Sequence, residues 1–480
     1  MRQNYLDEQL TAYSREDIYP FHMPGHKRVD QALMNPYSLD ITEIDGFDNL
    51  HDPREILLEA KNRLAKLYGA KESFFLVNGS TCGILAAISA ATGRGDTLLM
   101  ARNCHKAVYH GAALGGLHTE YLYPAITEGG IQGSISCEDV EQKLKEHPGI
   151  RAVILTSPTY DGVLSDIQRI ADCVHRYGIP LIVDEAHGAH LGFGGGFPKS
   201  AVAKGADVVI QSFHKTLPSL TQTAVLHRTS DRISSEKLQK YLGIYQTSSP
   251  SYVLMASIDR CVRLLEESGE EYFISFQRRL EHFYDEVKNL KNLKVLTEKD
   301  FLKKEAFQMD ISKILIDTSH TPLTGTELMD RLRRDHKLEL EMASRCYALA
   351  MTSIMDTEEG FDRLAKALTV LDQQMINYGN HEKAYDEKEP YRFIKELYGY
   401  REALLPVWKA EEMEREQIPI GQAEGRIAAG MISLYPPGIP VAVPGERLER
   451  DFLQQLLECH ERGLQVCGLG PDLQIDVITE

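Results

Sequence analysis

The most informative stretch of the chain runs Leu181-Ile182-Val183-Asp184-Glu185-Ala186-His187-Gly188. Its apolar start is typical of a short strand that is buried on both faces of a sheet. Asp184 ends that strand, and a carboxylate there has a large desolvation cost unless a cationic or protonated partner faces it. A helix cap is the structural alternative for Asp184. We favour a functional role, because nothing in an apolar strand requires an acid at its end.

Similar apolar runs recur on both sides of this stretch, and longer amphipathic segments separate them. The runs are Ser73 to Val77, Thr97 to Ala101, Glu120 to Tyr123, Arg151 to Thr156, Pro180 to Val183 and Ala206 to Gln211. Alternation of this kind predicts βα units and a mostly parallel sheet. We therefore expect an α/β domain in which six or seven strands lie between two layers of helices.

The first helix of this domain has clear start signals. Asp52 can cap it, Pro53 suits its first position, and Glu55 completes the spacing of a capping box. An apolar face then follows at helical spacing, formed by Leu57, Ala60, Leu64 and Leu67. This periodicity predicts an amphipathic helix that packs on the sheet.

The remainder of the chain divides into smaller units. A long helical region follows Tyr252, and residues from about 290 to 376 are predicted to form an α+β unit. Within this unit, Leu338, Leu340 and Met342 alternate with Glu339 and Glu341 as in a half-buried strand, while Phe361, Leu364, Leu368, Leu371 and Met375 have helical spacing. The polar run from Tyr378 to Pro390 is typical of a linker. We expect an arm over 1–50, a large domain over 51–285, a small α+β domain over 286–378 and a C-terminal domain over 390–480.

Composition narrows the class of protein. The 480 residues carry 53 Lys and Arg against 70 Asp and Glu, a net charge of −17, which argues against binding to nucleic-acid phosphates. The start of the chain has no apolar signal region, and no long apolar run is present, so we expect a cytosolic protein without a membrane partner. The eight cysteines form no C-x-x-C pair, which indicates reduced thiols and no zinc site.

Ligands of doubly wound sheets bind at the carboxyl ends of the strands, so the residues after each apolar run matter most. Asn78-Gly79-Ser80-Thr81-Cys82-Gly83 follows the first run and precedes an alanine-rich helix. Glycines, hydroxyls and a helix N-terminus together make an anion cradle, most naturally for phosphate. The same pattern is also typical of a capped turn.

Histidines follow two other strands. His105 comes after the second run, where an imidazole could stack on a flat ligand or could simply lie at the surface or cap a helix. His187 and His190 invite a metal interpretation. The sequence contains no H-E-x-x-H motif and no third ligand at a recognisable spacing, so we expect no metal.

Lys215 lies in Ser212-Phe213-His214-Lys215-Thr216, directly after the last run. A lysine at an interior strand end is costly when charged, and one solution is a lowered pKa and a Schiff base. A solvated loop lysine is the alternative for Lys215 taken alone. Together, a phosphate cradle, a stacking histidine, a buried Asp184 for a ring nitrogen and a lysine 31 residues later are what pyridoxal phosphate chemistry needs.

At these residues the chain resembles the Orn/Lys/Arg decarboxylase family of fold type I pyridoxal-phosphate enzymes. The resemblance covers nearly the whole chain and is carried by several motifs in order: Phe21-His22-Met23-Pro24-Gly25-His26-Lys27, Asp184-Glu185-Ala186-His187-Gly188, Ser212-Phe213-His214-Lys215 with Thr221-Gln222-Thr223, and Tyr435-Pro436-Pro437-Gly438-Ile439-Pro440 with Pro444-Gly445-Glu446. It implies an aspartate aminotransferase-like large domain with a mostly parallel seven-stranded sheet, a small α+β domain and a C-terminal domain. The chain is similar to the short members that lack an N-terminal wing domain.

The resemblance also implies a role for each site residue. Lys215 would form the internal aldimine with pyridoxal 5'-phosphate, Asp184 would pair with the pyridine nitrogen, and His187 would lie near the ring oxygen. His105 would stack on one ring face and Ala186 would pack on the other. Phosphate would be bound by Ser80, Thr81, Ser212 and His214, and by Thr247 or Ser248 of the partner subunit in a homodimer.

The implied reaction is α-decarboxylation of a basic L-amino acid, namely arginine, lysine or ornithine, to CO₂ and a polyamine precursor. Lys215, His105, Asp184 and His187 are the candidate catalytic residues, and Glu446 is the candidate partner of the substrate's distal cation. An aminotransferase or aldolase of the same fold is the alternative enzyme. A non-catalytic protein is the remaining hypothesis, and it predicts loss of Lys215 or Asp184, both of which are present.

Overall fold

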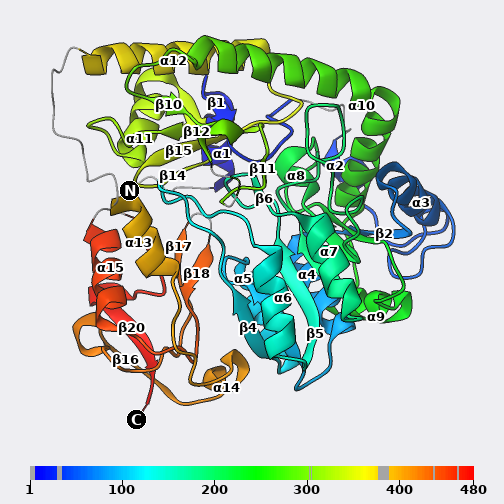
Figure 1. The fold of residues 1–480 in the computed structure, drawn as a ribbon. Helices are drawn as coiled ribbons and strands as arrows, with labels where there is room; N and C mark the ends of the chain where they lie inside the picture. Colours follow the sequence, from blue (N-terminus) through cyan, green and yellow to red (C-terminus); the bar gives the residue numbers. More distant parts are fainter. Residues whose placement is uncertain are drawn as a thin grey trace.

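The structure, a computed structural model, describes residues 6–29, 35–301, 303, 305–376, 389–435, 438–461 and 464–479. Three units with separate sheets lie side by side (Figure 1). The largest contains a seven-stranded sheet, the second a four-stranded sheet, and the third two small sheets near the C-terminus. Over the described residues, no helix has the length and apolar character needed to cross a membrane.

The large sheet confirms the predicted fold class. Its strands, in spatial order, are β2 (Glu72–Leu76), β9 (Ala224–Arg228), β8 (Val208–Gln211), β7 (Leu181–Asp184), β5 (Ile150–Thr156), β3 (Thr97–Ala101) and β4 (His118–Leu122). All neighbouring pairs are parallel except those of β9, which is antiparallel to β2 and β8. The six apolar runs all became strands, with ends shifted by up to two residues. The seventh strand, β9, has a shorter apolar run that ends in His227 and Arg228.

Helices connect these strands and cover the sheet. They are α3 (Ile56–Tyr68), α4 (Gly79–Ala91), α5 (Lys106–Gly115), α6 (Cys137–Glu146), α7 (Ile167–Arg176), α8 (Phe213–Thr216) and α9 (Ser235–Tyr245). The strand register aligns Thr156, Asp184 and Ile210 across β5, β7 and β8. The carboxyl ends of these strands therefore meet at one edge of the sheet, which is where the predicted site residues follow.

The predicted start of the first helix was wrong in its details. Helix α3 begins at Ile56, and no side chain at the Glu55 N-cap position makes a capping bond. Asp48 caps it instead, because its carboxylate accepts hydrogen bonds from the backbone N–H groups of Arg54, Glu55 and Leu57. Asp48 has a left-handed φ of 67°, and this turn brings its side chain back over the helix start. The predicted apolar face is largely correct: Leu57, Ala60 and Leu64 are buried.

The second unit is an antiparallel sheet covered by long helices. Its strands, in order, are β10 (Lys294–Val295), β12 (Lys313–Asp317), β15 (Tyr347–Met351) and β14 (Met342–Ala343). Helix α10 (Tyr252–Val287) leads into this unit from the large one and packs along α12 (Glu358–Ile376), and α11 (Gly325–His336) lies beside them (Figure 1). The five predicted apolar residues of α12 are all buried.

Two short pairings join this second unit to other parts of the chain. Strand β1 (Tyr19–Phe21), in the N-terminal arm after α1 (Leu6–Ser14), runs parallel to β13 (Leu338–Leu340). Strand β11 (Gln308–Met309) is antiparallel to β6 (Val163–Leu164), which follows β5. Helix α2 (Pro36–Leu39) lies farther along the arm. Both pairings hold the small unit against the carboxyl edge of the large sheet.

The third unit has its own core. It contains α13 (Glu389–Tyr398), α14 (Val407–Glu411), α15 (Arg450–Glu461), the pair β16 (Arg415–Pro419) and β20 (Gln474–Ile478), and the sheet β18 (Ile439–Ala442), β17 (Ile432–Tyr435) and β19 (Gln465–Cys467). The predicted linker from 378 to 390 falls outside the described residues up to 388, and its last two residues, Glu389 and Pro390, begin α13. The domain limits themselves stay predictions.

Candidate functional site

A cavity of about 520 Å³ lies at the carboxyl edge of the large sheet, and all three units contribute to its lining. It brings together most of the predicted site residues: Ser80, Thr81, His105, Asp184, Ala186, His187, Ser212, His214 and Lys215. These residues follow β2, β3, β7 and β8, so strand-end reasoning accounts for their convergence. Thr247, Ser248 and Glu446 are not part of the lining.

Lys215 lies in the single turn of α8, directly after β8. Its Nζ is 2.9 Å from His187 Nε2. Burial lowers the pKa of the Lys215 amine, and the nearby carboxylates of Asp184 and Glu341 oppose this shift. Burial, assisted by the Lys215 charge, also keeps the pKa of His187 well below its usual range. The imidazole of His187 is therefore neutral and contacts the lysine nitrogen through a hydrogen bond.

Asp184 ends β7 and is 3% exposed. Its Oδ1 accepts a hydrogen bond from the backbone N–H of Ala186 at 3.1 Å. Burial raises the pKa of Asp184, and the Lys215 charge opposes the rise. A carboxylate with so little hydrogen bonding favours a cationic donor as its partner.

The anion cradle is formed by the start of α4 and by α8. Gly79 has a φ of +72°, and Ser80 and Thr81 occupy the first turn of α4, where backbone N–H groups are free to bind an anion. Ser212 Oγ is buried without a hydrogen-bond partner. His214 uses Nδ1 to bond the carbonyl of Thr223 at 2.8 Å, which leaves Nε2 for a ligand.

His105 occupies the N-cap position of α5 and lines the cavity. Its Nδ1 accepts a hydrogen bond from the backbone N–H of Ala107 at 3.2 Å, so the ring is fixed and neutral. Burial, together with the Lys215 charge, lowers the pKa of His105 to about 4. A neutral, immobilised ring is suited to stacking on a flat ligand, the role that the resemblance implies.

These residues fit pyridoxal phosphate. The unpartnered Ser212 Oγ and the start of α4 match a phosphate, and the poorly solvated Asp184 matches a protonated ring nitrogen. His187 Nδ1 is also buried without a partner and can bond a ring oxygen. The lowered pKa of Lys215 suits an amine that reacts with an aldehyde.

Two acids and one arginine in the lining were not predicted to be site residues. Asp161 follows β5, accepts a hydrogen bond from Tyr347 Oη at 2.8 Å, and has a pKa that burial raises to about 6. Glu341 accepts hydrogen bonds from Tyr160 Oη and from the backbone N–H of Met23, the latter at 2.8 Å. Arg345 is the third. Strand-end reasoning applied to β5 would have found Asp161.

The alternation of Glu341 with apolar residues predicts that it lies on the outer face of a half-buried strand, where solvent is expected. The face opposite the small core turns toward the large unit instead, so Glu341 lines the cavity. Alternation of polar and apolar residues along a strand shows that the polar residues face away from the core on which that strand packs. It does not show whether those residues meet water or a second domain.

Glu446 has a different environment from the one expected. It is 1% exposed and lies 3.1 Å from Arg102, the residue directly after β3. It also accepts a hydrogen bond from the backbone N–H of Val443 at 3.0 Å. Arg102 donates in addition to the carbonyls of Pro440 and Val441. This buried network joins the third unit to the large sheet, and the substrate role of Glu446 stays a prediction.

Thr247 and Ser248 also stay predictions, because their proposed contact is with a partner subunit. Within its own subunit, the backbone N–H of Thr247 donates to Asn78 Oδ1 at 3.2 Å, one residue before the cradle. The two histidines that invited a metal interpretation have separate partners. His187 faces Lys215, whereas His190 lies 3.1 Å from Asp310.

Comparison with known proteins identifies the family. Residues 5–314 match the major domain of the Orn/Lys/Arg decarboxylases, and residues 403–475 match their C-terminal domain. The chain is 30% identical to the arginine decarboxylase of Bacillus subtilis over 95% of this chain and 93% of the relative. The solved lysine decarboxylase of Francisella novicida has the same fold, with a TM-score of 0.76 at 20% identity over 99% of this chain and 83% of that one. An alanine–glyoxylate aminotransferase from Nostoc sp. shares the fold more distantly, with a TM-score of 0.58 at 16% identity over 74% of this chain and 95% of that one. The chain thus belongs to the Orn/Lys/Arg decarboxylase family of amino-acid decarboxylases.

Proposed function

We propose that the chain is a pyridoxal-phosphate-dependent α-decarboxylase of a basic L-amino acid, with L-arginine as its first candidate substrate. The observation that supports this most is the grouping of Lys215, Asp184 and an anion cradle around one cavity. The choice of arginine is supported by relatives named arginine decarboxylase, at 30% identity over 95% of the chain. A relative named lysine decarboxylase, from Pseudomonas aeruginosa, is 23% identical.

When bound, pyridoxal phosphate supplies an electron sink for the pair released from the breaking Cα–carboxylate bond. Lys215 is the attachment residue, and its low pKa keeps the amine reactive. Asp184 holds a proton on the ring nitrogen, where negative charge develops. His105 and Ala186 line the same cavity and would contact the two faces of the ring.

Loss of CO₂ must be followed by proton delivery to the substrate Cα. Lys215 Nζ is the group we assign to this step, because as an ammonium it can give a proton to Cα and is then left as the neutral amine. His187 Nε2, at 2.9 Å, stabilises the orientation of that nitrogen through a hydrogen bond. Burial of Lys215, His187 and Asp184 excludes water that would otherwise screen these charges.

The substrate's distal cation needs an acid that reaches the cavity. Besides Asp184, the acids in the lining are Asp161 and Glu341, and Glu341 is the more exposed of these two residues. Glu446 is enclosed by Arg102 and by backbone. We therefore assign the distal cation to Glu341, with Asp161 as the second candidate in the lining.

Glu341→Gln is expected to raise KM for the cationic substrate by about tenfold to a hundredfold, since a charge-assisted hydrogen bond contributes roughly 1.5–3 kcal/mol. Glu446→Gln is the matched variant, because it removes the charge of the other candidate. It should leave KM near the wild-type value and lower the free energy of unfolding by about 3–5 kcal/mol, since Arg102 is left buried without its counter-ion. Steady-state kinetics and urea unfolding measure both effects. If KM rose in Glu446→Gln and stayed near the wild-type value in Glu341→Gln, Glu446 would be the residue that binds the distal cation.

Incubation of the purified protein with arginine, lysine and ornithine tests the reaction itself. We expect CO₂ and the matching amine without any added keto acid, with the highest kcat/KM for arginine, measured by amine chromatography. The aminotransferase alternative has one supporting observation, namely Arg345 in the cavity lining, on the small unit. Amino transfer that depends on a keto acid, without CO₂ release, would contradict the proposal.

A homodimer completes the proposed site. Thr247 and Ser248 lie outside the cavity of their own subunit, beside the residue that precedes the cradle. Two subunits that face each other at this segment could each supply hydroxyl groups to the other's phosphate. The proposal therefore includes a shared site, with Thr247 or Ser248 of the partner subunit as the additional phosphate ligand.

A further inference from the structure

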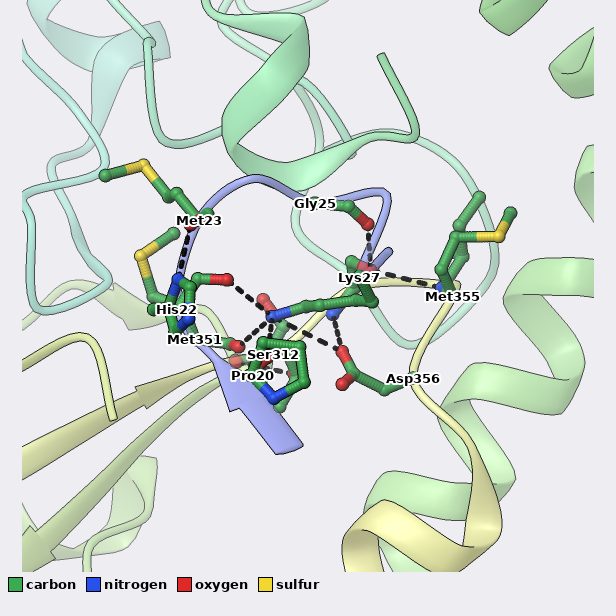
Figure 2. Close-up of polar contacts among 12 residues, drawn as sticks. Pro20, His22, Met23, Gly25, Lys27, Ser312, Met351, Met355 and Asp356 are labelled. Atoms are coloured by element: carbon green, nitrogen blue, oxygen red, sulfur yellow. Dashed lines mark hydrogen bonds and ion pairs between the residues drawn. The ribbon is translucent and has the colours of Figure 1, made fainter. Parts of the chain in front are cut away.

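In the Met23-Pro24-Gly25-His26-Lys27 motif, the Met23 N–H donates to Glu341, but Lys27 has no role in the chemistry proposed above and is deeply buried. Figure 2 shows Lys27 Nζ at the centre of a ring of oxygen atoms. The ammonium donates to the carbonyls of Pro20 at 3.0 Å, His22 at 3.0 Å and Met351 at 2.6 Å. Asp356 lies 3.7 Å away, and both side chains are almost fully enclosed.

This arrangement uses all three donors of the lysine, and it does so across two parts of the chain. Pro20 and His22 belong to the N-terminal arm, whereas Met351 ends β15 of the small unit. Lys27 and its neighbour Arg28 both have left-handed φ values, 50° and 62°, which residues other than glycine adopt only at a cost. The buried ion pair and three hydrogen bonds hold this strained turn in place.

The same turn contacts the helix that carries Lys215. The backbone N–H of Gly25 donates to the carbonyl of His214 at 2.7 Å, and Ser353 Oγ donates to the Gly25 carbonyl at 2.6 Å. Gly25 packs so closely on α8 that an added Cβ would lie 2.8 Å from the oxygen and 2.9 Å from the nitrogen of Leu217. Gly25 is therefore clamped between the small unit and α8.

Helix α8 cannot fix its own position. It has four residues, and one turn of helix gains too few internal hydrogen bonds to be stable alone. Its orientation must come from outside contacts, and the arm supplies one of them at the residue that precedes Lys215. A small shift of α8 would change the direction of the Lys215 side chain toward His187 and the cofactor.

We propose that Lys27 is a positioning residue for Lys215. It locks the arm turn onto the small unit, and the locked turn holds α8 through Gly25. The inference rests on the proposed function only in taking Lys215 as the attachment residue. The simpler alternative is that Lys27 stabilises the fold without affecting the active site, and the experiment below is designed to separate the two.

Lys27→Met should raise amide hydrogen exchange at residues 213–217 in the cofactor-free protein, beyond any general increase. In the cofactor-loaded protein it should lower kcat about tenfold or more, with little change in KM, because misplacement of a reacting group acts mainly on the chemical step. The pH midpoint of the visible cofactor absorbance should shift as well. Arg28→Ala is the matched control, since Arg28 is exposed and its guanidinium contacts the carbonyl of Ile18 and the ring of Tyr13, both within the arm.

Gly25→Ala tests the same connection without removing the lysine, and it decides the question if Lys27→Met fails to fold. Gly25→Ala should reproduce the increased exchange at residues 213–217 and the loss of kcat. The kcat of the double variant, with Lys27→Met and Gly25→Ala together, should be no lower than that of the slower single variant, because both substitutions disturb the same contact between the arm and α8. The proposal would be refuted if the folded variants had wild-type kcat when loaded with cofactor and wild-type exchange at residues 213–217 without it. If the wild-type protein released no CO₂, the proposed function would fail, while hydrogen exchange would still report on the arm and α8.

Discussion

Lys215→Ala should lose the visible absorbance of bound cofactor and reduce kcat on the order of 10⁴-fold or more. The reason is that Lys215 is assigned two tasks that no neighbouring group can take over, covalent attachment and proton delivery to Cα. His187 is the nearest other base, at 2.9 Å, but its pKa is held well below the usual range by burial. Absorbance spectra and CO₂ release measure the two losses independently.

The folding of this variant provides an internal check. Burial lowers the pKa of Lys215 in the folded protein, so at neutral pH the folded state must bury a charge or release a proton that the unfolded state keeps. Removing the amine removes this penalty, and it should leave the cofactor-free variant at least as stable toward heat as the wild type. A loss of activity together with a lower melting temperature would not support the assignment.

Lys204→Met is a suitable control for Lys215→Ala. Lys204 is half-buried near Glu185, has a pKa lowered by burial, and lies outside the cavity lining. Its replacement should keep both the visible absorbance and kcat. Retention of the cofactor spectrum in Lys215→Ala, or its loss in Lys204→Met, would show that the attachment residue lies elsewhere.

The large sheet could be predicted from the sequence because its strands are buried on both faces and therefore appear as apolar runs. The same logic placed Asp184, His105 and Lys215 at one edge, and the structure brings them into a single cavity. Strand β9 was harder to recognise, since polar His227 and Arg228 form its second half. Its histidine is satisfied inside the protein, where Ser73 and Gln211 bond the ring.

Sequence patterns could not predict the contacts between units. The alternation around Glu341 is the same whether its outer face meets water or another domain, and only the packing of the small unit on the large one distinguishes them. The capping of α3 by Asp48 depends on a loop that folds back, which short spacing rules do not describe. Glu446 likewise could not be assigned to Arg102, because the two residues are 344 positions apart.

Asp184→Asn is the second variant from which we expect a large effect. The amide has nearly the shape of the carboxylate, so cofactor bound by Lys215 and the cradle should remain. The ring nitrogen would lose the charge that keeps it protonated, and kcat should fall roughly 10³-fold, as for removal of a group that stabilises developing charge. The spectrum of the bound cofactor should change with it, whereas KM should change little.

Glu185→Gln is the matched control, because it neutralises an equally buried acid one residue away. Glu185 directly follows the last residue of β7. It accepts hydrogen bonds from Ser200 Oγ at 2.6 Å, the Ala201 N–H at 2.7 Å and Gln211 Nε2 at 2.7 Å, and it is not part of the cavity lining. Its loss of charge should affect stability more than kcat. Similar kcat losses in both variants would indicate a general electrostatic effect and not a specific partner.

A comparison of Asp184→Asn with Asp184→Ala separates charge from hydrogen bonding. Asn can still accept a hydrogen bond from a protonated ring nitrogen, whereas Ala cannot. If the negative charge is what holds the proton, the two variants should lose similar amounts of kcat, because neither keeps the ring nitrogen protonated. If Asn retained most of the activity and Ala lost it, the hydrogen bond alone would suffice. The raised pKa of Asp184 in the cofactor-free protein would then be a result of burial alone, and the negative charge would have no catalytic role.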